Sequence, residues 1–156
     1  MSTVVSAPAR ANHLVVLARE WAAHPEAWPH APRFNPGRRW YRQLHSAHDH
    51  EVWLLTWLPG QGTDLHDHGP SAGAFIVVSG QLVEQSFEDG RLHERRLAAS
   101  KGREFSREHI HRIVNPGDGP AVSVHVYGPA LSTMTRYQMT DGRPAIVGVD
   151  RAGVQW

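Results

Sequence analysis

One stretch of nine residues decides how the fold is interpreted: Gly60-Gln61-Gly62-Thr63-Asp64-Leu65-His66-Asp67-His68. His66 and His68 are two positions apart, so on an extended strand their imidazoles leave the same face and can reach one ion. His111, on a later predicted strand, offers a third imidazole, and His109 on the same strand face is an alternative to it. Three imidazoles leave positions open around a metal ion, as a catalytic site requires.

The composition narrows the chemistry further. The 156 residues include 12 histidines and no cysteine, which excludes a disulfide scaffold, a thiolate zinc site, an iron–sulfur cluster and a cysteine nucleophile. The formal charge of +1 gives no long-range field that would attract nucleic acid or an anionic membrane. The sequence shows neither a signal peptide nor a long apolar run, so we expect a cytoplasmic protein that binds a small molecule.

Two features of the composition reduce the weight of single arginines and of His-x-His pairs as evidence for a functional site. The basic residues are 15 arginines and one lysine, which indicates a coding bias, so a single arginine carries little weight. With 12 histidines, some His-x-His pairs arise by chance. His48 and His50 form such a pair in a predicted turn, and we expect them to be solvated loop residues.

The first quarter of the chain differs from the rest. Residues 1–37 are predicted to form a tail, one amphipathic helix and a proline-rich lead-in with at most one short turn. The helix is indicated by apolar residues at helical spacing, namely Leu14, Leu17, Ala18, Trp21 and Ala22. Residues 38–156 are predicted to form the β-domain.

Short runs of β-branched and aromatic residues alternate with turn residues beyond Arg38. The predicted strands are Arg39–His45, Glu51–Leu58, Ala74–Ser79, Leu82–Phe87, Leu92–Ala98, Arg103–Phe105, Ile110–Val114, Ala121–Tyr127, Thr133–Gln138 and Ala145–Val149. Strands this short and this numerous favour an all-β fold, a small closed barrel or jelly roll whose mouth can hold a ligand.

One predicted strand alternates strictly between polar and apolar residues. Its three polar residues, Ser123, His125 and Tyr127, are interleaved with valines. The polar side chains therefore share one face, and inside a barrel they need hydrogen bonds to one another or to a ligand.

The spacing of these motifs resembles the cupin superfamily. Gly60, then His66-x-His68, then Gly80 fit its first motif, and His111-x-x-x-Asn115 fits the end of its second. The resemblance implies a small cupin (jelly-roll) barrel, here with one or two N-terminal helices. Most cupins carry a glutamate ligand four or five residues after the second histidine, where this chain has Ala72 and Gly73. A three-histidine site is therefore expected.

A fuller resemblance, over about residues 39–142, is to the cysteine dioxygenase family of thiol dioxygenases. It implies Fe(II) held by His66, His68 and His111, with O2 and a small thiol as substrates and a sulfinate as product. It also implies that Ser123, His125 and Tyr127 form a relay directed at the bound substrate. The animal members carry a cysteine, crosslinked to this tyrosine, at the position of Gly73. A glycine there resembles the bacterial members, so Tyr127 should be a free phenol.

The motifs described so far do not decide which small thiol is the substrate. In the resembled family the carboxylate anchor lies on an early strand, as Tyr-x-Arg in enzymes that use cysteine or Tyr-x-Gln in those that use 3-mercaptopropionate. This chain has Tyr41-Arg42-Gln43, and the alternation of a strand allows only Arg42 or Gln43 to face the interior. We expect L-cysteine as substrate, with 3-mercaptopropionate or another small thiol acid as the alternative.

Other functions remain as alternatives to a thiol dioxygenase. A three-histidine cupin can oxidise a carbon substrate, but such a site would gain nothing from the Ser123–His125–Tyr127 relay. A cupin can also serve as a non-catalytic sensor or be held together by structural zinc. No DNA-binding helix is evident, so no nucleic-acid or membrane partner is expected. A monomer or weak homo-oligomer is expected.

Overall fold

The structure, a computed structural model, describes residues 11–151. The tail expected for residues 1–10 and the segment 152–156 lie outside the described residues. The helical elements are α1 (Ala11–Ala23) and the 3-10 helix η1 (Pro25–Ala27). The strands are β1 (Trp40–Ser46), β2 (Glu51–Trp57), β3 (Leu65–His66), β4 (Ala72–Ser79), β5 (Gln81–Glu88), β6 (Arg91–Ala98), β7 (Gly102–Phe105), β8 (Ile110–Val114), β9 (Ala121–Gly128), β10 (Thr133–Thr140) and β11 (Arg143–Arg151).

The predicted elements are confirmed. The helix, the short turn in the proline-rich lead-in and all ten predicted strands occur, and the strand ends differ from the predicted ends by two residues at most. The structure adds β3, which was not predicted as a separate strand. Its two residues are too few to produce an alternating pattern in the sequence.

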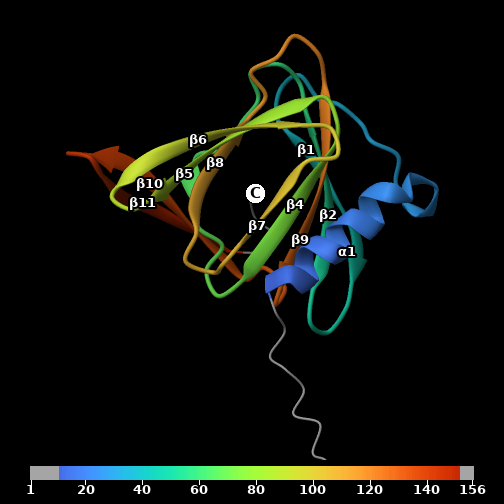
Figure 1. Cartoon of the computed structure of the whole chain (residues 1–156), viewed down its shortest axis with the longest axis horizontal. Coiled ribbons are helices and arrows are strands. Elements are labelled where there is room, and N and C mark those ends of the chain that lie inside the picture. Colours follow the sequence, from blue (N-terminus) through green and yellow to red (C-terminus); the bar gives the residue numbers. More distant parts are fainter. Residues whose placement is uncertain (1–10, 152–156) are drawn as a thin grey trace, which may run out of the picture.

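The strands form two antiparallel sheets. One sheet has the order β1-β2-β9-β4-β7 and the other β11-β10-β3-β8-β5-β6. Figure 1 shows the two sheets curving around a common interior, with α1 lying across the outside of the first sheet. The molecule is therefore an all-β barrel of two sheets with one helix on its outer surface.

Strand β9 separates the two hydrophobic cores of the protein. Val122, Val124 and Val126 pack in the cluster between the first sheet and α1. On the opposite face, His125 and Tyr127 line the barrel interior, and Tyr127 belongs to the inner core cluster. The strict alternation seen in the sequence is thus confirmed: the valines fix the strand against the helix, and the polar residues face inward.

Two Asp-Gly pairs close the β5–β6 and β10–β11 hairpins. Asp89 and Gly90 both have positive φ, at 52° and 79°, and Asp141 and Gly142 repeat these values. Positive φ at both central residues is what a type I′ turn requires, and this turn matches the twist of antiparallel strands.

Among residues 11–151, no helix has the length and apolar character that crossing a bilayer demands.

Candidate metal centre

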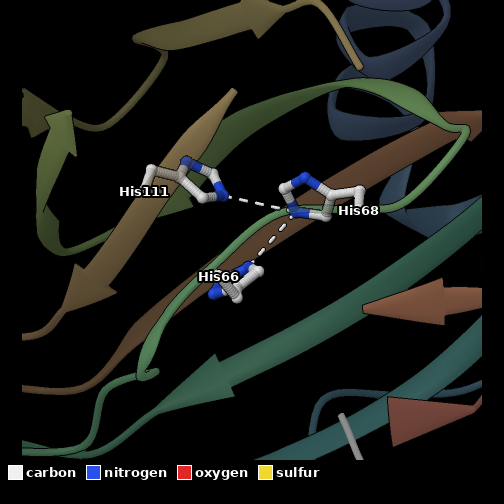
Figure 2. Close-up of side chains that lie close together, drawn as sticks. All are labelled: His66, His68 and His111. Carbon is white, nitrogen blue, oxygen red and sulfur yellow. Dashed lines mark hydrogen bonds between the residues drawn. The ribbon is translucent and has the colours of Figure 1, made fainter. Parts of the chain in front are cut away.

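Three histidine side chains meet inside the barrel. His66 is the last residue of β3, His68 follows two positions later, and His111 lies in β8, where it is the register partner of His66. The Nε2 atoms of His66 and His68 are 3.2 Å apart, and those of His68 and His111 are 3.3 Å apart. Figure 2 shows the three rings pointing toward one another. All three residues are buried.

The segment that carries His66 and His68 is a strand only in part. Strand β3 ends at His66, so His68 reaches the site from a turn rather than from an extended strand. Asp67 holds this turn: its Oδ1 accepts a hydrogen bond from the backbone N–H of Gly69 at 2.9 Å, and its Oδ2 accepts one from the Tyr137 hydroxyl at 2.6 Å. The Asp67 carboxylate therefore ties the motif to β10 and aims His68 inward.

The three imidazoles are neutral at ordinary pH. Burial lowers the pKa of His66 and His68 well below the usual value, and neighbouring histidines lower it further. Burial also lowers the pKa of His111, although the Glu84 carboxylate opposes this shift. Neutral imidazole is the form that binds metal.

The hydrogen bonds on the other ring nitrogens decide which nitrogens carry lone pairs. The Nδ1 of His66 lies 2.7 Å from the backbone carbonyl of Asp64, and the Nδ1 of His111 lies 2.7 Å from Glu84 Oε2. Both partners accept only, so each Nδ1 carries the proton and each Nε2 presents a lone pair. If His68 Nε2 carries a proton, it can donate that proton to the Nε2 of His66 or to that of His111, but not to both. At least one lone pair is then left without a hydrogen bond from these histidines.

A metal ion fits this arrangement of nitrogens. For a metal–nitrogen distance of about 2.1 Å, ligand nitrogens lie roughly 3.0–3.4 Å apart in octahedral or tetrahedral geometry. The Nε2 separations of 3.2 Å between His66 and His68 and 3.3 Å between His68 and His111 fall in this range. The three histidines thus form a candidate metal site made only of neutral nitrogen ligands.

Glu84 of β5 supports this site from behind. Its fully buried carboxylate contacts His111 at 2.7 Å, His109 at 3.2 Å and the guanidinium of Arg103 at 2.9 Å. Burial alone would raise the pKa of Glu84, but hydrogen bonds from His109 and His111, with the charge of Arg103, lower it to about 2. The carboxylate stays ionised and fixes the ring of His111.

His109 occupies a different position from the three converging histidines. It lies just before β8, is buried, and directs its Nε2 to Glu84. It forms a second cluster with Glu84 and His111. The structure therefore places His111 in the group of three and His109 behind it.

His48 and His50 were predicted to be solvated loop residues. His48 is exposed, whereas His50 is half-buried.

Ser123, His125 and Tyr127 form a chain of hydrogen bonds along β9. Ser123 Oγ lies 2.7 Å from His125 Nε2, and His125 Nδ1 lies 3.3 Å from the Tyr127 hydroxyl. The indole N–H of Trp57 donates to Ser123 Oγ at 2.8 Å. If the Ser123 hydroxyl in turn donates to His125, each group donates to the next, and the proton of Tyr127 is left to donate into the cavity.

Burial sets the protonation of this chain. Burial, with the nearby His111 and Arg39, lowers the pKa of His125 to about 3. Burial raises the pKa of Tyr127 well above its usual value. The chain is therefore a neutral imidazole next to a protonated phenol at physiological pH.

A cavity opens next to the histidines and the phenol. Its walls include His66, His111, His125 and Tyr127 together with two arginines, Arg39 and Arg136. The Arg39 guanidinium lies 5.3 Å from the centre of the Trp57 ring, and burial lowers its pKa. Arg136 Nε lies 2.9 Å from Asp150 Oδ2. Two half-buried arginines beside neutral imidazoles make this cavity suited to an anionic group.

Of the three residues expected to bind substrate, only Tyr41 lines this cavity. Arg42 is exposed on the opposite face of β1, the face on which Trp40 and Leu44 pack toward the outer cluster. Gln43 shares the face of Tyr41, and its amide donates to Glu51 at 3.0 Å. The structure thus brings neither Arg42 nor Gln43 into the cavity wall.

Four residues around the site were not predicted from the sequence: Glu84, Arg103, Arg39 and Arg136. Glu84 alone could have been noticed, because it is a charged residue on the same face as Leu82 in a predicted strand. The three arginines were hidden among 15.

Comparison with known proteins gives the family of the chain. The family model described as "Cysteine dioxygenase type I" matches residues 3–140. A curated relative from zebrafish (Danio rerio), "Cysteine dioxygenase type 1", is 24% identical over 145 residues, covering 81% of this chain and 69% of the relative.

Solved structures show the fold. A protein from Klebsiella pneumoniae with a double-stranded β-helix domain aligns with a TM-score of 0.56 and 19% identity, over 74% of this chain and 90% of its own. A cupin superfamily protein from Desulfitobacterium hafniense aligns with a TM-score of 0.52 and 12% identity, over 61% and 81%. The expected cupin barrel is confirmed.

Replacing Glu84 tests how far this carboxylate supports the centre. Glu84→Gln keeps the size but removes the charge that holds His111, so metal affinity should fall roughly 10- to 100-fold, as for other partners of ligating histidines. Chelator competition on metal-free protein measures the change. His109→Ala is the matched control, because it removes the other imidazole on Glu84 and should have a far smaller effect. Equal losses in both variants would contradict the role of Glu84.

The buried histidines predict how stability depends on pH. His66, His68, His111 and His125 have lowered pKa values when folded, so the unfolded chain binds more protons below about pH 6.5. The free energy of unfolding should therefore be higher at neutral pH than in acid, and it should decrease as the pH falls below about 6.5. Thermal unfolding of the metal-free protein should give a lower Tm at about pH 5.5 than at about pH 7.5.

Two variants control this measurement. His125→Gln should weaken the dependence on pH, whereas His30→Gln, at an exposed position, should leave it unchanged. An equal or higher Tm in acid would contradict the prediction.

Proposed function

The chain belongs to the cysteine dioxygenase type I family and is a thiol dioxygenase, and we propose that it oxidises a small thiol carboxylate at an Fe(II) centre held by His66, His68 and His111. The observation that carries this proposal is the convergence of three neutral imidazoles beside a cavity that is also lined by the half-buried Arg39. A site of uncharged imidazole nitrogens suits a ferrous ion that must also accept a thiolate.

An iron ion held by His66, His68 and His111 would supply the oxidative chemistry, by which the thiol would lose its proton and both atoms of O2 would add to its sulfur. The balance is one thiol and one O2 to one sulfinic acid, with no external reductant.

The residues of the chain hold the substrate and control its surroundings. Arg39 is placed to bind the carboxylate, since its guanidinium lines the cavity and is held over Trp57. Tyr127 keeps its proton and can donate a hydrogen bond to the group at the metal. His125 accepts a hydrogen bond from the Ser123 hydroxyl at Nε2 and holds the Tyr127 hydroxyl through Nδ1. This is positioning of a donor before the reaction begins, as in other sites that stabilise developing charge.

The register of β1 favours 3-mercaptopropionate as the substrate. In the resembled family, Tyr-x-Gln on this strand is typical of enzymes that use 3-mercaptopropionate. Here Gln43 is on the same face of β1 as Tyr41, which lines the cavity, whereas Arg42 is on the opposite face. Gln43 itself is bonded to Glu51 and does not form part of the cavity wall. The expectation of cysteine rested on the resemblance of the remaining motifs to bacterial members of the family that use cysteine, and the choice between Arg42 and Gln43 was open.

L-cysteine is the second candidate, favoured by a different observation. Two carboxylates, those of Asp64 and Asp150, also line the cavity and lie near Arg136. They could receive the α-ammonium group of cysteine, which 3-mercaptopropionate lacks.

Oxygen consumption by the iron-loaded protein tests the function. The assay compares 3-mercaptopropionate, L-cysteine, mercaptosuccinate and cysteamine, with the sulfinate product identified by mass spectrometry. We expect the highest kcat/KM with 3-mercaptopropionate. Iron binding without oxygen uptake on any thiol would instead support a non-catalytic cupin.

Arginine variants test the carboxylate anchor in the same assay. Arg39→Gln should raise the KM for 3-mercaptopropionate about 10- to 100-fold, the worth of a hydrogen bond to a charged group. It should have little effect on cysteamine, which has no carboxylate. Arg42→Gln is the matched control and should behave like the unmodified protein. A comparable rise in KM for Arg42→Gln would place the anchor at Arg42 instead.

A further inference from the structure

His68 is held differently from the other two converging histidines. His66 and His111 each have a hydrogen-bonded Nδ1, whereas the buried Nδ1 of His68 has no hydrogen-bond partner within residues 11–151. A metal-binding histidine usually depends on such a bond to fix the orientation of its ring. Something else must therefore orient His68.

Two aromatic rings lie against the ring of His68. The ring of Phe105 is stacked on it at a centroid distance of 4.7 Å and an angle of 26°. The ring of Tyr127 is stacked at 5.2 Å and 30°. Both distances are close to the spacing of neighbouring strands, about 4.8 Å.

The sheet explains this spacing. Phe105 is in β7 and Tyr127 in β9, the two neighbours of β4, and both are register partners of Gly73 in β4. The two rings therefore approach Gly73 from its two neighbouring strands and lean over it. The ring of His68 contacts both of them.

Gly73 is needed for room rather than for backbone conformation. It is not among the glycines with positive φ in the described chain. A Cβ at this position would lie 2.5 Å from Phe105 Cζ and 3.0 Å from Tyr127 Cδ1. Any larger residue would therefore push the two rings out of place.

We propose that Phe105 and Tyr127 form an aromatic clamp on His68, with Gly73 providing the space for it, and that Phe105 is a positioning residue for the metal centre. The inference rests on the proposed metal site. The clamp restricts rotation of the His68 ring and keeps its Nε2 directed at the other two histidines. It takes the place of the hydrogen bond that His66 and His111 have.

Another stacked pair in the barrel serves as a control. Phe75 is fully buried and stacks on His125 at 5.2 Å and 14°. Phe75 meets His111 only edge-on, at 6.3 Å, so Phe75→Leu removes a ring whose stacking partner is outside the converging three. Phe105→Leu makes the same chemical change next to His68, and also next to His109 and His111, whose ring centroids lie 5.0 and 4.9 Å from that of Phe105. Both substitutions stay apolar and cost packing to a similar degree.

The first experiment measures the affinity of the metal-free full chain for Fe(II), under anaerobic conditions with a competing chelator. Phe105→Leu should bind Fe(II) about 10-fold more weakly, as when other partners of ligating histidines are lost. Phe75→Leu should bind like the unmodified protein. The d–d spectrum of bound Co(II) should change in Phe105→Leu and stay unchanged in Phe75→Leu. Equal Fe(II) affinities for Phe105→Leu and Phe75→Leu would overturn the clamp.

The second experiment separates positioning from packing. Gly73→Ala alone should lower the Tm, because its methyl group collides with the Phe105 ring. Leucine lacks the outer ring atoms, so Gly73→Ala combined with Phe105→Leu should recover much of the Tm. The Fe(II) affinity of the double variant should stay low, since the clamp is still missing. Recovery of Fe(II) affinity together with Tm would show that Phe105 only fills space.

Fe(II) binding by the unmodified protein distinguishes the proposal of a metal centre from the proposal of an aromatic clamp. If it fails to bind Fe(II), the proposed metal centre is wrong, and the clamp falls with it. If it binds Fe(II) and Phe105→Leu binds equally well, only the clamp is wrong.

Discussion

The pairing of β3 with β8 places His66 directly opposite His111, and the rest of the site depends on this pairing. Two neutral imidazoles on adjacent strands direct their lone pairs into the barrel, and a third joins them from the turn after β3. Such a group is unstable unless each ring is held from outside, because lone pairs do not bind one another. A backbone carbonyl, the buried carboxylate of Glu84 and two aromatic rings supply that support.

Much of the barrel could be predicted from local patterns. The alternation of Ser123, His125 and Tyr127 with valines identified both faces of β9, because side chains in a strand point to opposite sides in turn. The spacing of His66 and His68 indicated that they could reach a common point, although only His66 lies in a strand and His68 follows the end of β3. These predictions succeeded because they depend on neighbours in the sequence.

The supporting residues could not be predicted, because they depend on which strands become neighbours. Phe105 reaches His68 only because β7 and β9 flank β4, and Glu84 reaches His111 only because β5 pairs with β8. Arg39 lay among many arginines, so its burial over Trp57 was the first sign of a role. On β1, only the observed register could decide between Arg42 and Gln43.

The register of β1 also shifts between Gln43 and His45, so this strand contains an irregularity beside the cavity. In a strand, displacing the chain by a single position turns every side chain to the other face. A displacement of one residue in β1 would exchange Tyr41 for Trp40 or Arg42 on the cavity wall. A single insertion or deletion in this strand would thus be enough to bring an arginine to the wall, without substitution of any residue already there.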